Sequence, residues 1–380
     1  AGSIKTGQAL NNSGRIQANG GIDLSLHNGL NNRGEVNLNS LTVSGETLSN
    51  QDGKILAQST DIRTRTVQND RGQITAGKAL NVRSEQVSNR VGKLQSAGNA
   101  DLNVSRRLDN QGGEITANQA LNIHDQGAKT LHLDNTDGSV LGGDVSVQSQ
   151  SLNNRGKLAA ARDLSIDVKD DLHVERDLEA GNALSISTEG SLNNTRNLTA
   201  EAAVQVRAKQ NVSNRGLINS NGLTRVEAGQ ELLNTGTGRI YGNHVALAAD
   251  KLNNREENGK AAVVAARKRL DIGAKQIVNQ EGALLSSEGD LAIGGSLTAE
   301  HTAQGRAESL INGSARIEAQ GNADIAVKDL KNLNNHLKVE EYLEKKTEQV
   351  REYAVLNQND YYREGRDGYF DNSRGQDDQT

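Results

Sequence analysis

Branched aliphatic residues and asparagine recur together along most of the chain, at steps of about twenty residues. Each time the order is an aliphatic residue, a variable residue and Asn, beginning at 10–12 and 30–32 and ending at 330–332. At Leu172 the aliphatic residue holds its place, but Val174 replaces the Asn. A fixed period of this size predicts a repeat architecture, in which each repeat buries its apolar side chains by stacking on its neighbours.

Two further runs of alternating residues lie between successive Asn positions. In the repeat that begins at Val67, Ile74 and Ala76 form the first run, and Leu80 and Val82 form the second. Alternation with period two predicts β-strands. Glycines mark the turns between the runs, but no hairpin sequence occupies a fixed place in the repeat. Three short strands in about twenty residues therefore predict one turn of a parallel β-helix.

We accordingly predict an all-β fold, a right-handed parallel β-helix of about 16 turns over residues 1–335, followed by a C-terminal extension outside the repeat. The hand follows from the crossover preference of parallel strands. Turns about 4.8 Å apart imply a rod of roughly 75 Å. Three steps between repeats are longer, at 108–133, 252–277 and 277–310, and we expect their extra residues to form side loops or strands.

Stacking in register places the repeated asparagines over one another as a ladder. Stacked amides bond one another and nearby backbone groups wherever the side chain is turned inward. We assign them a structural role, because a turn Asn adopts left-handed angles and bonds its own backbone without any ligand. The predicted ladder comprises Asn12, Asn32, Asn50, Asn69, Asn89, Asn110, Asn154, Asn194, Asn214, Asn234 and Asn254.

The composition agrees with a narrow core. Tyr241 is the only aromatic residue before residue 342, and the chain has no Pro and no Cys. A thin core of aliphatic residues has no room for large rings, and Pro would remove donors from the strand ladders. Without Cys there is no disulfide and no thiolate metal site, which is compatible with a bacterial protein that stays unfolded until it crosses an outer membrane.

Charge and hydropathy exclude several classes of partner. The net charge is −5, and residues 336–380 carry −4 of it. No basic stripe with interleaved aromatics is present, so we predict no nucleic-acid partner. No apolar run is long enough for a membrane-spanning helix. No signal peptide is visible at Ala1, where the sequence begins within a repeat, so we expect a piece of a longer protein.

The composition changes abruptly near His336. The stretch 339–356 is compatible with an amphipathic helix or with a strand, and we favour extended structure followed by a charged arm. We expect residues 336–380 to be either a cap over the end of the rod or the start of a receptor-binding region, since exposed Tyr is favoured in interfaces. The candidate partner-binding residues are Tyr342, Tyr353, Tyr361, Tyr362, Tyr369 and Phe370.

The sequence offers no pattern typical of catalysis, and we predict no enzyme, no cofactor and no metal site. The seven His residues do not form a His-Glu-x-x-His motif. Residues 236–238 lack the third Gly of a dinucleotide loop, and residues 134–138 lack the spacing of a calcium loop. We interpret the acidic residues between 163 and 177 as a solvated face, because the rod lacks the aromatic platforms of polysaccharide-cleaving β-helices.

The repeat unit, Leu-x-Asn-x-x-Gly-x-Ile-x-Ala-x-x-x-Leu-x-Ile/Val, resembles the haemagglutinin repeats of filamentous haemagglutinin-type exoproteins of Gram-negative bacteria, which are exported by two-partner secretion. The clearest matches are residues 30–34, 152–156, 239–246, 269–274, 281–284 and 289–295. The resemblance covers about residues 1–335. It implies a secreted or surface-exposed protein that leaves the cell through an outer-membrane transporter.

The order of the segments is most similar to the rod of contact-dependent growth inhibition exoproteins. This resemblance implies a rigid stalk that holds a recognition region toward a receptor on a neighbouring bacterium, for delivery of a toxin. The chain contains neither the family's secretion domain nor a toxin, and members without a toxin act as adhesins. The alternative is therefore an adhesin for host cells or biofilm matrix. A third class, a polysaccharide-degrading enzyme, would require a clustered acidic groove.

Overall fold

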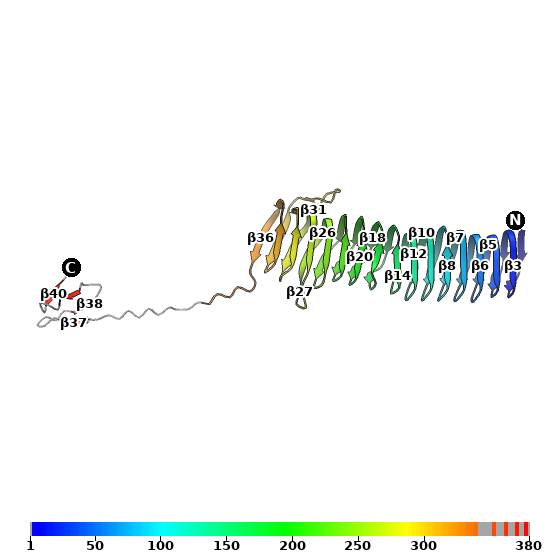
Figure 1. The fold of residues 1–380 in the computed structure, drawn as a ribbon, viewed down its shortest axis with the longest axis horizontal. Helices are drawn as coiled ribbons and strands as arrows, with labels where there is room; N and C mark the ends of the chain where they lie inside the picture. Colours follow the sequence, from blue (N-terminus) through cyan, green and yellow to red (C-terminus); the bar gives the residue numbers. More distant parts are fainter. Residues whose placement is uncertain (1, 341–351, 355–360, 364–368, 372–375, 379–380) are drawn as a thin grey trace. The chain divides into compact units, whose positions relative to one another are not determined.

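The computed structural model describes residues 2–340 and, beyond them, the backbone of 352–354, 361–363, 369–371 and 376–378. The chain divides into two compact units, Ala1–Asn335 and His336–Thr380. The first is a right-handed parallel β-helix of about 17 turns, and the described residues include no helix. The predicted fold class is confirmed. The turns follow one another along the rod from β3 to β36 (Figure 1).

The strands of the first half of the rod are β1 (Gly2–Thr6), β2 (Leu10–Asn12), β3 (Arg15–Leu26), β4 (Leu30–Asn32), β5 (Glu35–Ser49), β6 (Lys54–Gln68), β7 (Gln73–Ser88), β8 (Lys93–Ser96), β9 (Asn99–Asp109), β10 (Glu114–His124), β11 (His132–Asp134), β12 (Ser139–Ser149), β13 (Ser151–Asn153), β14 (Lys157–Ala160), β15 (Asp163–Val168), β16 (Leu172–Val174), β17 (Leu178–Ala180) and β18 (Ala183–Thr188).

Those of the second half are β19 (Leu192–Asn194), β20 (Asn197–Ala200), β21 (Ala203–Ala208), β22 (Val212–Asn214), β23 (Leu217–Ser220), β24 (Leu223–Ala228), β25 (Glu231–Thr235), β26 (Arg239–Glu257), β27 (Lys260–Ala261), β28 (Val263–Gln280), β29 (Leu284–Ser287), β30 (Asp290–Gly294), β31 (Ser296–Leu297), β32 (Ala303–Gln304), β33 (Ala307–Gly313), β34 (Arg316–Ala319), β35 (Ala323–Ile325) and β36 (Val327–Leu333).

Each turn contributes to three faces of the rod. The asparagine face holds the Leu-x-Asn segments, the second face holds the Ile-x-Ala segments, and the third face holds the Leu-x-Val segments. Strand β6 pairs in parallel with β7 on all three: Val67 lies beside Val87, Ile55 beside Ile74, and Ile62 beside Val82. Equivalent residues of successive repeats therefore stack in register.

The core is a set of aliphatic columns along the inside of the rod. Ile55, Ile74 and Leu94 are fully buried on the second face, and Ile62 and Leu102 are fully buried on the third. Burial of one such side chain contributes about 1.5–3 kcal/mol, so the stabilisation grows in proportion to the number of turns. Because the interior is narrow, aliphatic side chains fill it without any aromatic ring in the described part of the rod.

The three longer steps carry additions to the rod, as predicted. The first adds a loop over residues 125–131. In the second, β27 forms an antiparallel hairpin with the end of β26, where Glu256 lies beside Ala261. In the third, β31 and β32 form a hairpin with Ser296 beside Gln304. Both hairpins stand out from the stack of turns (Figure 1).

The second unit contains two antiparallel strand pairs. Strand β37 (Glu352–Ala354) pairs with β38 (Tyr361–Arg363), and β39 (Tyr369–Asp371) pairs with β40 (Gln376–Asp378). Most of the stretch 339–356, for which helix and strand were both compatible with the sequence, lies outside the described residues.

Replacing Ile74 with Asp tests the stacking of the core. We expect Ile74→Asp to lower the stability of the rod by about 3–5 kcal/mol, because it places an unpaired charge at a fully buried position. Thermal unfolding followed by circular dichroism measures the effect. The matched control is Asn81→Asp on the same strand, where the side chain is exposed. Equal melting of both variants would contradict the β-helix core.

Candidate functional site

The repeated asparagines form two hydrogen-bonded columns inside the asparagine face. In each, the amide Nδ2 donates to the Oδ1 of the Asn one turn later, at 2.7–2.9 Å. One column comprises Asn12, Asn32, Asn50, Asn69, Asn89, Asn110, Asn135 and Asn154, and the other Asn194, Asn214, Asn234, Asn254, Asn279, Asn312 and Asn332.

The columns contain all the asparagines of the predicted ladder and four more. Asn135, Asn279 and Asn312 each follow one of the longer steps, and Asn332 follows Asn312. Each of the four stands two positions after an aliphatic residue, which identifies it in the sequence although the three longer steps break the twenty-residue spacing. The side loops and hairpins therefore leave the inner amide stack unchanged.

Each buried Asn closes its own turn as well as binding the next. Asn69 is completely buried, and its Nδ2 donates to Asn89 Oδ1 at 2.7 Å, to Lys93 O at 3.0 Å and to Gly72 O at 3.3 Å. Its backbone N–H donates to Ser88 O at 2.7 Å. A buried amide without these partners would cost about 1–3 kcal/mol, so the column is stabilising only while it is complete.

The turns after these asparagines require a tight approach of two backbones. At Gly72 an added Cβ would lie 2.0 Å from Asn50 O, and the preceding Arg71 has a φ of 56°. Glycine fits because it has no Cβ, and the left-handed residue before it completes the turn. The Asn-x-x-Gly spacing in the sequence thus reflects a steric requirement of stacking.

A buried carboxylate attaches the β31–β32 hairpin to the third face. Asp271 is fully buried and accepts hydrogen bonds from His244 Nε2 at 2.8 Å, from Arg269 Nε at 2.6 Å and from the backbone N–H of Ala303 at 2.8 Å. Burial alone would raise the pKa of Asp271, but these three donors lower it to about 2. The hairpin is therefore held to the rod by a charged group.

His301 lies in the same hairpin, and its Nδ1 is buried without a hydrogen-bond partner. Burial lowers the pKa of His301, and the nearby side chains of Arg225 and His244 lower it further, against the opposing effect of Glu300 and Glu227. The docked hairpin therefore favours the neutral imidazole over the protonated one. Sequence spacing gave no signal for this cluster, because an insertion brings its members together.

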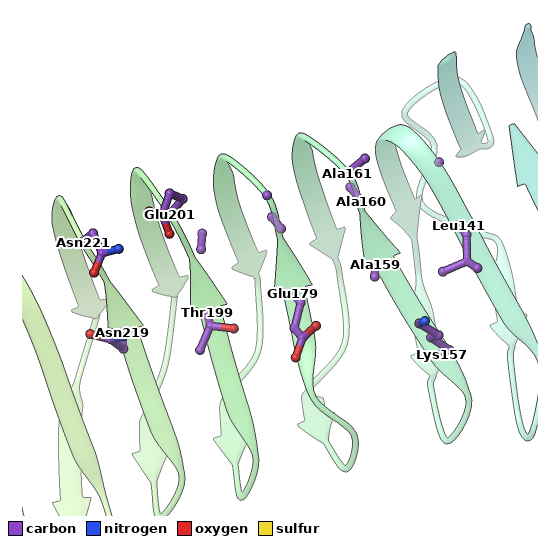
Figure 2. A pocket seen from close by; sticks show the side chains of 14 residues that line it. Leu141, Lys157, Ala159, Ala160, Ala161, Glu179, Thr199, Glu201, Asn219 and Asn221 are labelled. Atoms are coloured by element: carbon purple, nitrogen blue, oxygen red, sulfur yellow. The ribbon is translucent and has the colours of Figure 1, made fainter. Parts of the chain in front are cut away.

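An open groove of about 630 Å³ crosses the outer surface of the second face. Glu179, Thr199 and Asn219 point outward from β17, β20 and β23 on successive turns (Figure 2). The next residue in this outward column is Tyr241, the single aromatic residue of the rod. Each of these turns presents one carboxylate, hydroxyl or amide group beside alanines such as Ala180 and Ala200, so the groove offers hydrogen-bonding groups on a mixed polar and apolar surface.

Several of the acidic residues between 163 and 177 form separate hydrogen bonds with groups of the next turn, and they do not converge on one site. Asp163 accepts from Asn182 Nδ2 at 2.7 Å, and Asp171 accepts from the Ser191 backbone N–H at 2.7 Å.

Within the part of the chain that the structure describes, no group of three or more His, Cys, Asp or Glu side chains is placed to hold a metal ion. A search of the same residues for long apolar helices that could cross a membrane found none.

The candidate partner-binding aromatics lie in the second unit. Tyr342 is outside the described residues. The backbone of Tyr353 pairs with that of Tyr362, and Tyr361 pairs with Ala354. Tyr369 and Phe370 belong to β39. Binding of a partner by these residues stays a prediction.

Comparison with protein families gave one match. The model of the haemagglutinin repeat matches residues 1–59, 35–104, 242–324 and 288–339, which together cover more than half of the chain. Residues 105–241, between the matched ranges, form turns of the same three-faced kind. Searches of the curated proteins and of the solved structures found no match.

Replacing Asn89 with Val tests the amide column. We expect Asn89→Val to destabilise the rod by about 2 kcal/mol or more, because Asn69 Nδ2 loses an acceptor and Asn110 Oδ1 loses a donor in a buried site. The exposed Asn81→Ala is the control, with little expected change. Thermal unfolding compares the two, and a column without stabilising effect would give equal melting temperatures.

Acidification should release the β31–β32 hairpin in two stages. The lowered pKa of His301 means that docking is favoured above pH 6.5 and weakens as the pH falls below it. The pKa of Asp271, about 2 against an ordinary 3.8, contributes on the order of 2 kcal/mol above pH 3.8, lost as the pH falls toward 2.

Amide exchange of residues 296–304, corrected for the intrinsic effect of pH, measures the release. Asp271→Asn keeps the acceptor but removes the charge, so the low-pH stage should disappear in that variant. Exchange that is independent of pH in the wild-type protein would contradict this role of the two side chains.

Proposed function

The chain belongs to the haemagglutinin repeat family, and on this premise we propose that its β-helix is the rigid extracellular stalk of a filamentous exoprotein. Proteins of this family are typically secreted or exposed on the cell surface. The observation that carries the proposal is the succession of about 17 stacked turns, which implies a rod of roughly 80 Å. Because each turn packs on its two neighbours, such a rod extends in one direction and holds its ends apart.

We further propose that the stalk belongs to a contact-dependent system that delivers a toxin to neighbouring bacteria. The resemblance of the repeats to those exoproteins supports this proposal, as does the change from an aliphatic rod to the aromatic-rich residues 336–380. In this arrangement the aromatic segment begins the recognition region, and a receptor on the target cell is its partner.

An adhesin is the second candidate, favoured by the groove on the second face. In that case the outer surface of the rod binds host cells or biofilm matrix, with Glu179, Thr199 and Asn219 among the contact residues. The stalk then acts along its side rather than by presenting a distal region.

The export partner in both cases is the outer-membrane transporter of a two-partner secretion system. A chain without Cys forms no disulfide that would prevent its passage in an unfolded state. Each emerging repeat can then fold by stacking on the previous turn.

Cell binding distinguishes the candidates. The full chain, a 1–335 truncation and a full-length variant with Tyr353, Tyr361 and Tyr362 changed to Ser would be compared for binding to Gram-negative bacteria and to epithelial cells. We expect binding to bacteria that is lost in both altered proteins. Binding to epithelial cells by all three proteins would instead favour the adhesin, and its loss in Glu179→Ala would identify the groove. Circular dichroism confirms that each variant is folded.

A further inference from the structure

One face of the rod is interrupted at a single step, between residues 152–154 and 172–174. Strand β13 pairs with β11 before the step, and β16 pairs with β19 after it. Among the strands that the structure describes, β13 and β16 have no pairing with each other. The backbone ladder of the asparagine face therefore stops at this step and resumes one turn later.

The interruption coincides with the gap between the two amide columns. The column that begins at Asn12 ends at Asn154, because Val174 has no amide to continue it, and the second column begins at Asn194. Upstream, the backbone N–H of Asn110 and of Asn135 each donates to the next turn at 2.8 Å. In the described part of the chain, no equivalent bond leads from Asn154 to the next turn.

The other two faces continue through the same step. On the second face Leu158 lies beside Leu178, and on the third face Leu164 lies beside both Val145 and Leu184. The turns therefore remain attached along two sides. At the corner before β16 they are also joined by the Lys169 N–H, which donates to Ser149 O at 3.1 Å, and by the Asp170 N–H, which donates to Gln150 O at 2.9 Å. Only the segments 152–154 and 172–174 of the asparagine face are open to separation. A stack attached in this way bends most easily by widening the unpaired face.

Ion pairs cross the interrupted step at both corners of the asparagine face. At one corner Arg155 Nε binds Glu175 Oε2 at 2.7 Å, with both side chains largely exposed. At the other, Lys129 from the inserted loop binds Asp167 and Glu189, each at 3.0 Å. The Lys129 side chain is only 16% exposed, so it is the better protected of the two connections.

We propose that this step is a joint in the stalk. Across the asparagine face, the ion pairs of Lys129 (the Lys129 strap) and the Arg155–Glu175 pair take the place of the buried amide bond and of the pairing between β13 and β16. The rod then consists of two stiff segments, one on each side of the step, that bend relative to each other by opening the asparagine face. The exposed Arg155–Glu175 pair contributes only about 0–1 kcal/mol and is screened by salt, so the less exposed Lys129 pairs are the stronger ionic connection across the joint.

The difference between this step and its neighbours predicts a local and salt-dependent opening. Residues 172–174 keep their pairing with β19, but 152–154 have no later strand to pair with. The amides of residues 152–154 should therefore exchange with solvent about tenfold faster than those of 212–214 and 232–234, where the pairing is complete. Raising the salt concentration from 0.05 M to 1 M should accelerate exchange at the joint alone, since the Debye length falls from above 10 Å to about 3 Å.

Two pairs of variants of the full chain test the cause by hydrogen exchange and mass spectrometry. Val174→Asn supplies the missing amide and should slow exchange at the joint, while Asn214→Val should create a new fast-exchanging step in the second column. Lys129→Ala should accelerate exchange at the joint and reduce its salt dependence. Lys209→Ala is the matched control, because it removes an ion pair with Glu189 across a step whose backbone pairing is intact.

Equal protection of 152–154, 212–214 and 232–234 in the wild-type protein would overturn the proposal. So would exchange at the joint that is unaffected by both Lys129→Ala and salt. The measurement is internal to the rod, so its outcome is independent of whether the stalk serves toxin delivery or adhesion. Thermal unfolding of each variant distinguishes local opening from general loss of the fold.

Discussion

The structure depends on register: each turn must place its side chains over those of the turn before it. A buried amide is the group most sensitive to this requirement, because Asn69 must reach Asn89, its own turn and the next backbone at once. Aliphatic columns tolerate small shifts, since packing of Ile on Val or Leu changes little in energy. The amide column does not, because a misplaced member leaves buried polar groups without partners. The inner amides therefore specify the register that the aliphatic core stabilises.

Once register is set, the surface is free to vary. Insertions at residues 125–131, 256–261 and 296–304 leave the three faces in place, because a turn needs only its neighbours. These additions also make contacts with residues far away in the sequence. Asp271 accepts from Ala303 across 32 residues, and Lys129 reaches Glu189 across 60. The repeats thus form a regular scaffold, and the features that distinguish one part of the rod from another lie in the inserted loop and hairpins.

Much of the fold follows from the sequence, because the repeat is local and its period is visible. The alternation at Ile74, Ala76, Leu80 and Val82 predicts the strands, and the recurring Asn predicts where turns stack. The hairpin cluster at Asp271 and the Lys129 strap could not be predicted in the same way. Their partners meet only because insertions fold back onto particular turns. An insertion has no repeat pattern, so the sequence does not show which turn it will contact. The replacement at Val174 is visible in the sequence, but its effect on the backbone ladder is not.

The amide columns also have a direction. Every Nδ2 donates toward the later turn, from Asn12 to Asn32 and from Asn312 to Asn332, so all the bonds point the same way along the rod. The two ends of any partial stack are consequently different in chemistry: the earlier end offers acceptors and the later end offers donors. A chain that folds turn by turn from one end would add each repeat to a surface of constant polarity. The column is therefore an oriented chain of dipoles, and growth of the stack from its earlier end and from its later end would take place on chemically different surfaces.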